Sequence, residues 1–126
     1  MAARANRPRP GLSQTLVWRL TAFTGIGLFV LLAVHMVAHH FVVKSTGGLR
    51  TYDQVLDYLA NPVIFVVECL LLGFITIHAM LGLRSVLFDL TTGARARARI
   101  SRGLVALGAL TIGYGLFLVG TLASRA

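Results

Sequence analysis

The sequence predicts an all-α integral membrane protein, a bundle of three transmembrane helices with a short amphipathic helix in the first loop. Of the 126 residues, 56% are hydrophobic and only 13% are charged, a balance that ordinary soluble domains do not have. Three apolar stretches, at about 16–43, 63–89 and 103–123, each reach the roughly 20 residues that a spanning helix needs. We therefore expect one membrane domain over residues 1–126, whose apolar side chains face lipid and neighbouring helices.

The N-terminal part contains two different kinds of sequence. Residues 1–12 are rich in Arg and Pro and lack apolar periodicity, which predicts a flexible segment. The apolar stretch 16–43 is far longer than the roughly 7–15 apolar residues of a secretory signal, and no small-residue cleavage site interrupts it. We therefore interpret it as the first spanning helix, with a signal peptide as the weaker alternative.

The first loop, 44–62, is predicted to contain secondary structure of its own. It begins with a turn signal at 45–48 and continues with apolar residues at helical spacing over 52–59. Such spacing favours a short amphipathic helix that lies at the outer membrane surface. Pro62 then opens the second span, at a position where its missing N–H needs no partner.

The basic residues are sorted by loop in the way that sets membrane topology. Nine of the twelve lie before or at the start of the first span or around the predicted basic loop 90–102: Arg4, Arg7, Arg9, Arg19, Arg84, Arg95, Arg97, Arg99 and Arg102. This pattern predicts a cytoplasmic N-terminus, an outside C-terminus and a place in the cytoplasmic (inner) membrane of a prokaryote. It also accounts for the net charge of +8 through contact with the lipid bilayer, so we expect no nucleic-acid partner.

His35 and His78 lie inside the first and second spans. An imidazole at membrane depth needs a partner, and haem iron is among the commonest. A rise of about 1.5 Å per residue puts His35 in the outer half of the membrane and His78 slightly inside the midplane. Gly82, one turn from His78, would let a flat porphyrin approach the helix. Both histidines are candidate axial ligands of haem iron, and hydrogen bonding to a neighbouring helix is the alternative for each.

Four further polar residues lie close to these histidines in the predicted spans. Glu68 is about as deep as His39 and His40, and we predict that it contacts one of them, either for structure or near a haem propionate, in preference to a proton relay. Arg84 is interpreted as extending to the cytoplasmic headgroups, and the alternative is that it contacts a haem propionate.

The sequence contains no set of residues typical of a self-contained enzyme. It has no nucleophile–base pair, no Cys/His zinc-finger spacing and no Gly-rich phosphate loop before a helix. The chain is therefore expected to be non-catalytic alone. A haem-free membrane scaffold or small transporter subunit, with the histidines and Glu68 as a polar seam between helices, is the alternative to an electron-carrying subunit.

Short motifs follow one another in a fixed order from Trp18 to the end of the third span. They are Trp18-Arg19 and Thr24-Gly25, His35, Tyr-Asp-Gln-Val-Leu at 52–56, and His78-Ala-x-x-Gly-Leu-Arg84 running to Asp89. In this order the chain resembles the membrane-anchor cytochrome b subunits, of the C/D type, of succinate dehydrogenase (succinate:quinone oxidoreductase, complex II).

This resemblance implies a second membrane-anchor subunit beside the chain, with an iron–sulfur subunit and a flavoprotein subunit docked on the cytoplasmic side. Electrons from succinate then reach quinone, the substrate at the membrane. His78 matches an axial ligand of haem b whose other ligand comes from the partner anchor. His35 matches the ligand of the second haem in two-haem members. Since the two histidines lie in different halves of the membrane, we expect two haems b, with one haem as the alternative.

The resemblance also implies a quinone site near the cytoplasmic end. Its candidate residues here, which can hydrogen-bond quinone carbonyls or relay protons, are Ser13, Trp18, Arg19 and Asp89. Leu90 stands where one anchor type has a tyrosine, and Trp18-Arg19 stands where the other type often has His-Arg. The choice between the C and D subunits therefore stays open. An anchor of a fumarate reductase or of another dehydrogenase is a further alternative.

Overall fold

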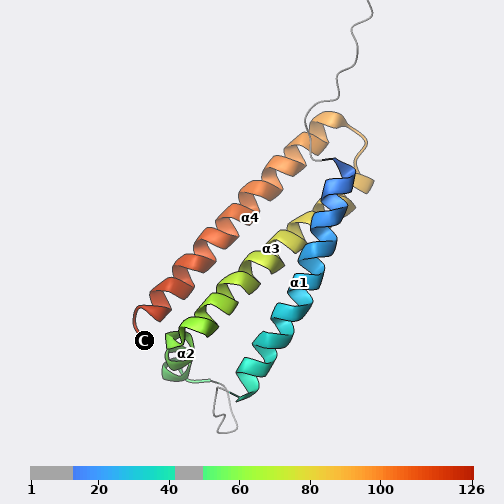
Figure 1. The fold of residues 1–126 in the computed structure, drawn as a ribbon. Helices are drawn as coiled ribbons and strands as arrows, with labels where there is room; N and C mark the ends of the chain where they lie inside the picture. Colours follow the sequence, from blue (N-terminus) through green and yellow to red (C-terminus); the bar gives the residue numbers. More distant parts are fainter. Residues whose placement is uncertain (1–12, 42–49) are drawn as a thin grey trace, which may run out of the picture.

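The computed structural model describes residues 13–41 and 50–126, and these residues form four helices (Figure 1). The helices are α1 (Gln14–Phe41), α2 (Tyr52–Ala60), α3 (Pro62–Asp89) and α4 (Ala94–Ala123). Helices α1, α3 and α4 are each long and apolar enough to cross a membrane. The predicted all-α class, with three long apolar helices and a short helix between the first two, is confirmed. The predicted flexible segment 1–12 and the turn at 45–48 lie outside the described residues.

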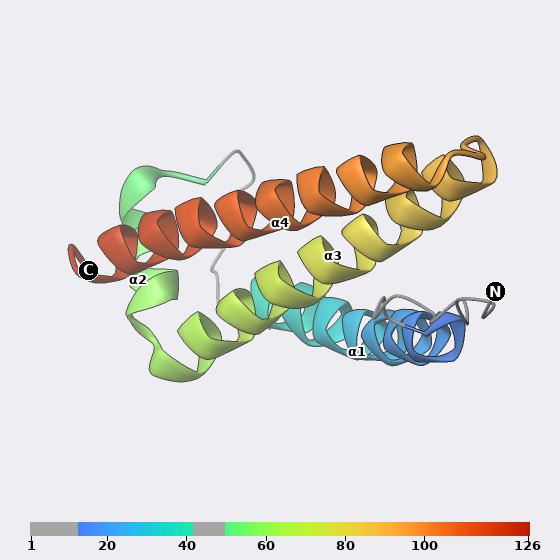
Figure 2. The same cartoon turned by 90° about the horizontal axis from the view of Figure 1, so that it is seen from above.

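Helix α3 is the centre of the bundle. It packs against α1 on one side and α4 on the other, whereas the described backbones of α1 and α4 lie apart from each other (Figure 2). Glycines make these approaches close, since a methyl group at Gly27 of α1 would overlap the ring of Phe74. One at Gly115 of α4 would overlap Leu72 in the same way. Small residues let membrane helices pack by van der Waals contact, which is the main attraction available to them in lipid.

Most large apolar side chains of the three long helices face outward. Phe29 is 77% exposed and Phe117 67%, and the buried polar side chains among the described residues are only Thr24 and Thr76. A soluble protein would bury such aromatic rings, so these outer faces suit lipid or another membrane chain. The outward faces of α1, α3 and α4 are therefore largely apolar.

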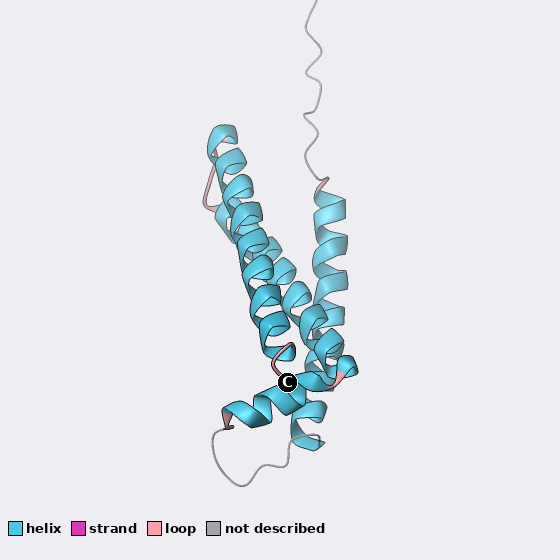
Figure 3. Cartoon of the chain, turned by 90° about the vertical axis from the view of Figure 1, so that its left-hand side faces the viewer, coloured by secondary structure: helices cyan, strands magenta, loops and turns pink. Residues whose placement is uncertain are grey.

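Helix α2 lies across the ends of α3 and α4 (Figure 3). A capping box at its start joins Thr51 and Gln54, and at its end Asn61 caps α3 by accepting from the backbone N–H of Val63 at 2.9 Å. Pro62 occupies the first turn of α3 as expected. The buried core at this end consists of Tyr58, Leu59 and Ile64.

The predicted loop 90–102 is helical for most of its length, so this prediction is wrong there. The connection between the last two helices spans only 90–93, and α4 begins at Ala94. Alanine and arginine are both strong helix formers, so the basic run is helical and precedes the apolar stretch within α4. Arg97 also stabilises the tight connection, donating from Nε to the carbonyl of Thr91 at 2.7 Å and from Nη2 to that of Phe88 at 3.0 Å.

The two ends of the bundle differ in charge. The start of α1 and the α3–α4 connection lie at one end, and α2 and the C-terminus lie at the other (Figure 1). Six of the eight described arginines belong to the first of these, which we call the basic end: Arg19, Arg84, Arg95, Arg97, Arg99 and Arg102. Arg4, Arg7, Arg9 and Lys44, which also entered the topology prediction, lie outside the described residues.

Candidate functional site

His78 of α3 forms a hydrogen bond to α1. Its Nδ1 lies 3.2 Å from Oγ1 of Thr24, which is buried with 4% of its surface exposed. The Thr24 hydroxyl also lies 2.7 Å from the carbonyl oxygen of Leu20 and 3.1 Å from that of Thr21. When it donates to either carbonyl, it accepts from Nδ1–H of His78, and in that tautomer Nε2 carries the lone pair.

The Nε2 atom of His78 is open to ligands. Among the described residues it has no hydrogen-bond partner, and none of their buried side-chain nitrogen or oxygen atoms lacks one, so Nε2 reaches the surface of the chain. Gly25 makes room for the imidazole, because a Cβ there would lie 3.2 Å from Cε1 of His78. Beside Gly82, one turn further, nothing described lies within 4 Å of the Cβ position. An unprotonated Nε2 next to an open helix surface fits a flat iron macrocycle.

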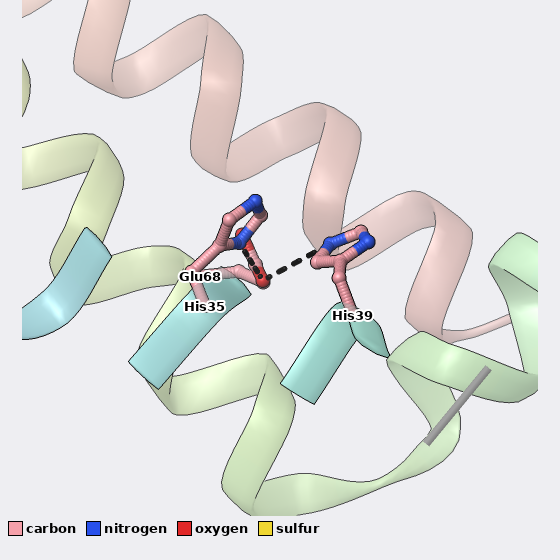
Figure 4. Close-up of side chains that lie close together, drawn as sticks. All are labelled: His35, His39 and Glu68. Carbon is pink, nitrogen blue, oxygen red and sulfur yellow. Dashed lines mark hydrogen bonds and ion pairs between the residues drawn. The ribbon is translucent and has the colours of Figure 1, made fainter. Parts of the chain in front are cut away.

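A second polar group joins three helices at the end opposite the basic end (Figure 4). We call it the Glu68 cluster; its members are His35, His39, Tyr58 and Glu68. Oε1 of Glu68 lies 2.7 Å from Nδ1 of His35 and 3.9 Å from Nε2 of His39. The Tyr58 hydroxyl donates to the same oxygen at 2.7 Å. The imidazole rings of His35 and His39 lie 4.1 Å apart, measured between their centroids.

Glu68 has one of its two predicted partners, His39, at 3.9 Å. The nearer histidine is His35, at 2.7 Å, whose contact with α3 is the alternative that was stated beside haem ligation. His40 is exposed and packs edge-on against Phe41 instead, at 4.9 Å between ring centroids. His35 and His39 are four residues apart and share a face of α1, whereas His40 is turned about 100° from His39.

Tyr58 is a member of the cluster that the sequence interpretation missed. It lies in α2, outside the spanning helices, and is 5% exposed. Burial raises the pKa of its hydroxyl, and the hydrogen bond to the Glu68 carboxylate raises this pKa further. Arg50 lies nearby, donating to the backbone carbonyl of His39 at 3.2 Å, with its guanidinium 5.6 Å from the Tyr58 ring centroid.

A polar cavity of about 360 Å³ lies at the basic end, between the start of α1 and the end of α3. Its lining contains Arg84, Asp89 and Arg97 together with Gln14, Val17, Ser85 and Phe88. Arg84 is held here by Phe88, whose ring centroid is 4.2 Å from its guanidinium carbon, and by Ser101, whose Oγ lies 3.5 Å from Nε. Arg84 also borders an apolar cavity of about 400 Å³ between α3 and α4.

The four residues predicted to bind quinone are only partly brought together. Asp89 lines the polar cavity, and Trp18 lines a neighbouring open one that shares Gln14 with it. Ser13 and Arg19 are exposed and line neither cavity. The hydroxyl of Ser13 accepts from the backbone N–H of Leu16 at 3.2 Å, at the start of α1.

Three apolar spans, a short capping helix and histidines at membrane depth define a small all-helical, multi-pass membrane subunit. Residues 4–117 match the family described as the succinate dehydrogenase/fumarate reductase transmembrane subunit, and the chain belongs to this family. It is 28% identical over 106 residues to the succinate dehydrogenase hydrophobic membrane anchor subunit of Archaeoglobus fulgidus. That alignment covers 84% of this chain and 88% of the relative. The inferred resemblance to a succinate dehydrogenase membrane anchor is thereby confirmed.

Proposed function

We propose that the chain is a cytochrome b anchor of a succinate:quinone oxidoreductase, in which Nε2 of His78 binds the iron of haem b. The observation that carries this proposal is the hydrogen bond between His78 and Thr24. A histidine that ligates metal usually donates its other ring N–H to a fixed acceptor, which sets its tautomer and orientation. The buried Thr24 hydroxyl is such an acceptor, at 3.2 Å.

When bound, haem b supplies a one-electron carrier inside the membrane. The chain's own residues hold it and set its surroundings. Thr24 keeps the imidazole of His78 in one orientation, and Gly25 and Gly82 leave the space that the ring system needs. Phe74, which packs against Gly27 on the same pair of helices, adds an apolar wall. Arg84, two residues beyond Gly82, is the cation available to a haem propionate.

Quinone is proposed to bind at the basic end, in the polar cavity beside Asp89. Asp89, Arg84 and Arg97 all line this cavity, so it offers groups that can hydrogen-bond a quinone carbonyl and deliver a proton to it. The Trp18 indole borders the neighbouring cavity and is 70% exposed. Ser13 and Arg19 keep their predicted roles only if the partner subunits close this end around them.

The partners follow from the same proposal. The basic end faces the cytoplasm by the positive-inside rule, and there it meets the iron–sulfur subunit, with the flavoprotein subunit beyond it. The outward apolar faces suit lipid and a second anchor subunit, which supplies the other axial ligand of the haem. The name of the Archaeoglobus fulgidus relative favours succinate oxidation over fumarate reduction.

The second haem at His35 stays a prediction. In its favour, Glu68 accepts from the Nδ1 side of His35, which is the same kind of support that Thr24 gives His78. Against it, the ring of His39 packs at 4.1 Å from that of His35 and occupies part of its surroundings. The spectrum described next counts the haems directly.

The test is a reduced-minus-oxidised spectrum with pyridine haemochrome quantification on the purified complex. We compare the wild type with the variants His78→Ala and His35→Ala, and with His40→Ala as the matched control. The proposal predicts that His78→Ala removes one haem b while His40→Ala removes none. A wild-type complex without haem would instead support a haem-free scaffold. Loss of a further haem in His35→Ala would establish the second site.

A further inference from the structure

We propose that His35, His39 and Glu68 together bind a divalent first-row transition-metal ion, at a site separate from His78. Each residue offers one ligand atom, and the three atoms all lie within 4.8 Å of one another. Figure 4 shows both imidazoles extending from α1 to the carboxylate of α3. The inference does not depend on haem at His78, so the two can fail separately, and it is the alternative to a second haem at His35.

The spacing of the donor atoms suits a small ion. Ligands held at about 2.0–2.2 Å around a tetrahedral ion are roughly 3.3–3.6 Å apart. The two histidine nitrogens lie 2.7 Å and 3.9 Å from Oε1 of Glu68, one shorter and one longer than this separation. Side-chain rotations that move these atoms by roughly half an ångström therefore open the first pair and close the second around a central ion.

The donor set has the chemistry of a transition-metal site. Two imidazole nitrogens and one carboxylate oxygen suit zinc and its neighbours in the first row, whereas calcium and magnesium prefer oxygen ligands alone. His35 and His39 are four residues apart and therefore lie on one face of α1, as paired histidine ligands on a helix usually do. The Tyr58 hydroxyl, at 2.7 Å, orients the carboxylate from outside the ligand set.

The charge balance also favours a cation. Glu68 lies seven residues into a spanning helix, and no described lysine or arginine is within ion-pair distance of its carboxylate. A carboxylate at membrane depth needs a compensating charge, which a divalent ion between two neutral imidazoles supplies. The site can also be reached, because the side chains of His35, His39 and Glu68 are 24%, 27% and 16% exposed.

The experiment measures zinc bound to the purified whole complex. The wild type and the variants His39→Ala, Glu68→Gln and His40→Ala are dialysed against low micromolar Zn²⁺, and the metal is counted per complex by mass spectrometry. The proposal predicts that the wild type and the control His40→Ala each retain one more zinc ion than His39→Ala and Glu68→Gln. The haem content is expected to be the same in all four. Equal zinc in all four complexes would overturn the proposal.

A second measurement decides the case if a variant does not assemble. Cu²⁺ added to the wild-type complex is examined by electron paramagnetic resonance, where two imidazole ligands give a characteristic nitrogen hyperfine pattern. The proposal predicts this pattern at one equivalent of Cu²⁺, and its displacement by excess Zn²⁺. A spectrum without coupling to two nitrogens would overturn the proposal. So would loss of a haem in His39→Ala or Glu68→Gln, since the cluster would then serve a porphyrin.

Discussion

The Nδ1 atom of His78 and the buried hydroxyl of Thr24 lie 3.2 Å apart and join α3 to α1 near the middle of the bundle. The Thr24 hydroxyl also reaches the carbonyls of Leu20 and Thr21, at 2.7 Å and 3.1 Å. When it donates to one of them it accepts from Nδ1 of His78, and this tautomer presents the Nε2 lone pair that binds iron. A helix-packing contact and the orientation of a candidate haem ligand depend on the same hydrogen bond.

Thr24→Val removes this acceptor while keeping the shape of the side chain. Loss of such a supporting partner typically lowers metal affinity or activity by about 10–100-fold, so we expect weaker haem retention and a shifted midpoint potential. Both are measured by redox titration of the purified complex. Thr111→Val is the matched control, because Thr111 is exposed and bonds only to the backbone of its own helix. An unchanged potential and haem content in Thr24→Val would contradict the role assigned to Thr24.

Gly27→Ala is expected to loosen the packing of α1 on α3. The added methyl group would overlap the ring of Phe74, and overpacking of this kind typically costs about 1–3 kcal/mol. Thermal unfolding of the complex should therefore begin at a lower temperature. Gly113→Ala serves as the control, since nothing described lies within 4 Å of its Cβ position. Equal unfolding temperatures for the two variants would show that this contact does not limit stability.

Tyr58 should keep its proton well above its ordinary pKa of 10.0, because burial and the Glu68 carboxylate both raise the pKa of its hydroxyl. A raised pKa in the folded state stabilises the fold fully below pH 10 and loses this contribution as the pH rises further. The measurement is an alkaline titration of tyrosinate absorbance in the wild type and in Tyr58→Phe. The difference in tyrosinate absorbance between the two proteins should appear only at the most alkaline pH values. A tyrosine of ordinary pKa in the difference curve would contradict the buried hydrogen bond.

Asp89→Asn should impair quinone reduction without affecting succinate oxidation. A hydrogen bond to a charged group typically contributes about 1.5–3 kcal/mol, so we expect roughly a tenfold or larger loss of kcat/KM for quinone. The rate with a soluble artificial electron acceptor, which bypasses the membrane, should stay unchanged. Asp57→Asn, an exposed residue on α2, is the control. An unchanged rate with quinone would show that the cavity beside Asp89 is not the quinone site.

The number of spanning helices was predictable from the sequence because a bilayer imposes a minimum apolar length on each. The same reasoning failed at 90–102, since hydropathy indicates where lipid ends and says nothing about where a helix begins. Alanine and arginine both have high helix propensity, so α4 already includes the basic residues that follow Ala94.

The contacts between helices were harder to predict. The sequence indicated that Glu68 needs a partner at its depth, but the choice of His35 over His40 depends on the rotation of α1 against α3. The four-residue spacing of His35 and His39 was the available signal. Thr24 stood in a recognised motif, yet its bond to His78 joins residues 54 positions apart and follows only from the packed structure.

The central claim, that Nε2 of His78 binds haem iron, is tested most directly by chemical rescue of His78→Gly in the purified complex. The proposed ligation predicts that this variant loses the low-spin b-type spectrum of this haem and that haem added together with imidazole, which enters the space left by the side chain, restores it. A His78→Gly complex whose haem spectrum equals that of the wild type without imidazole would contradict the assignment.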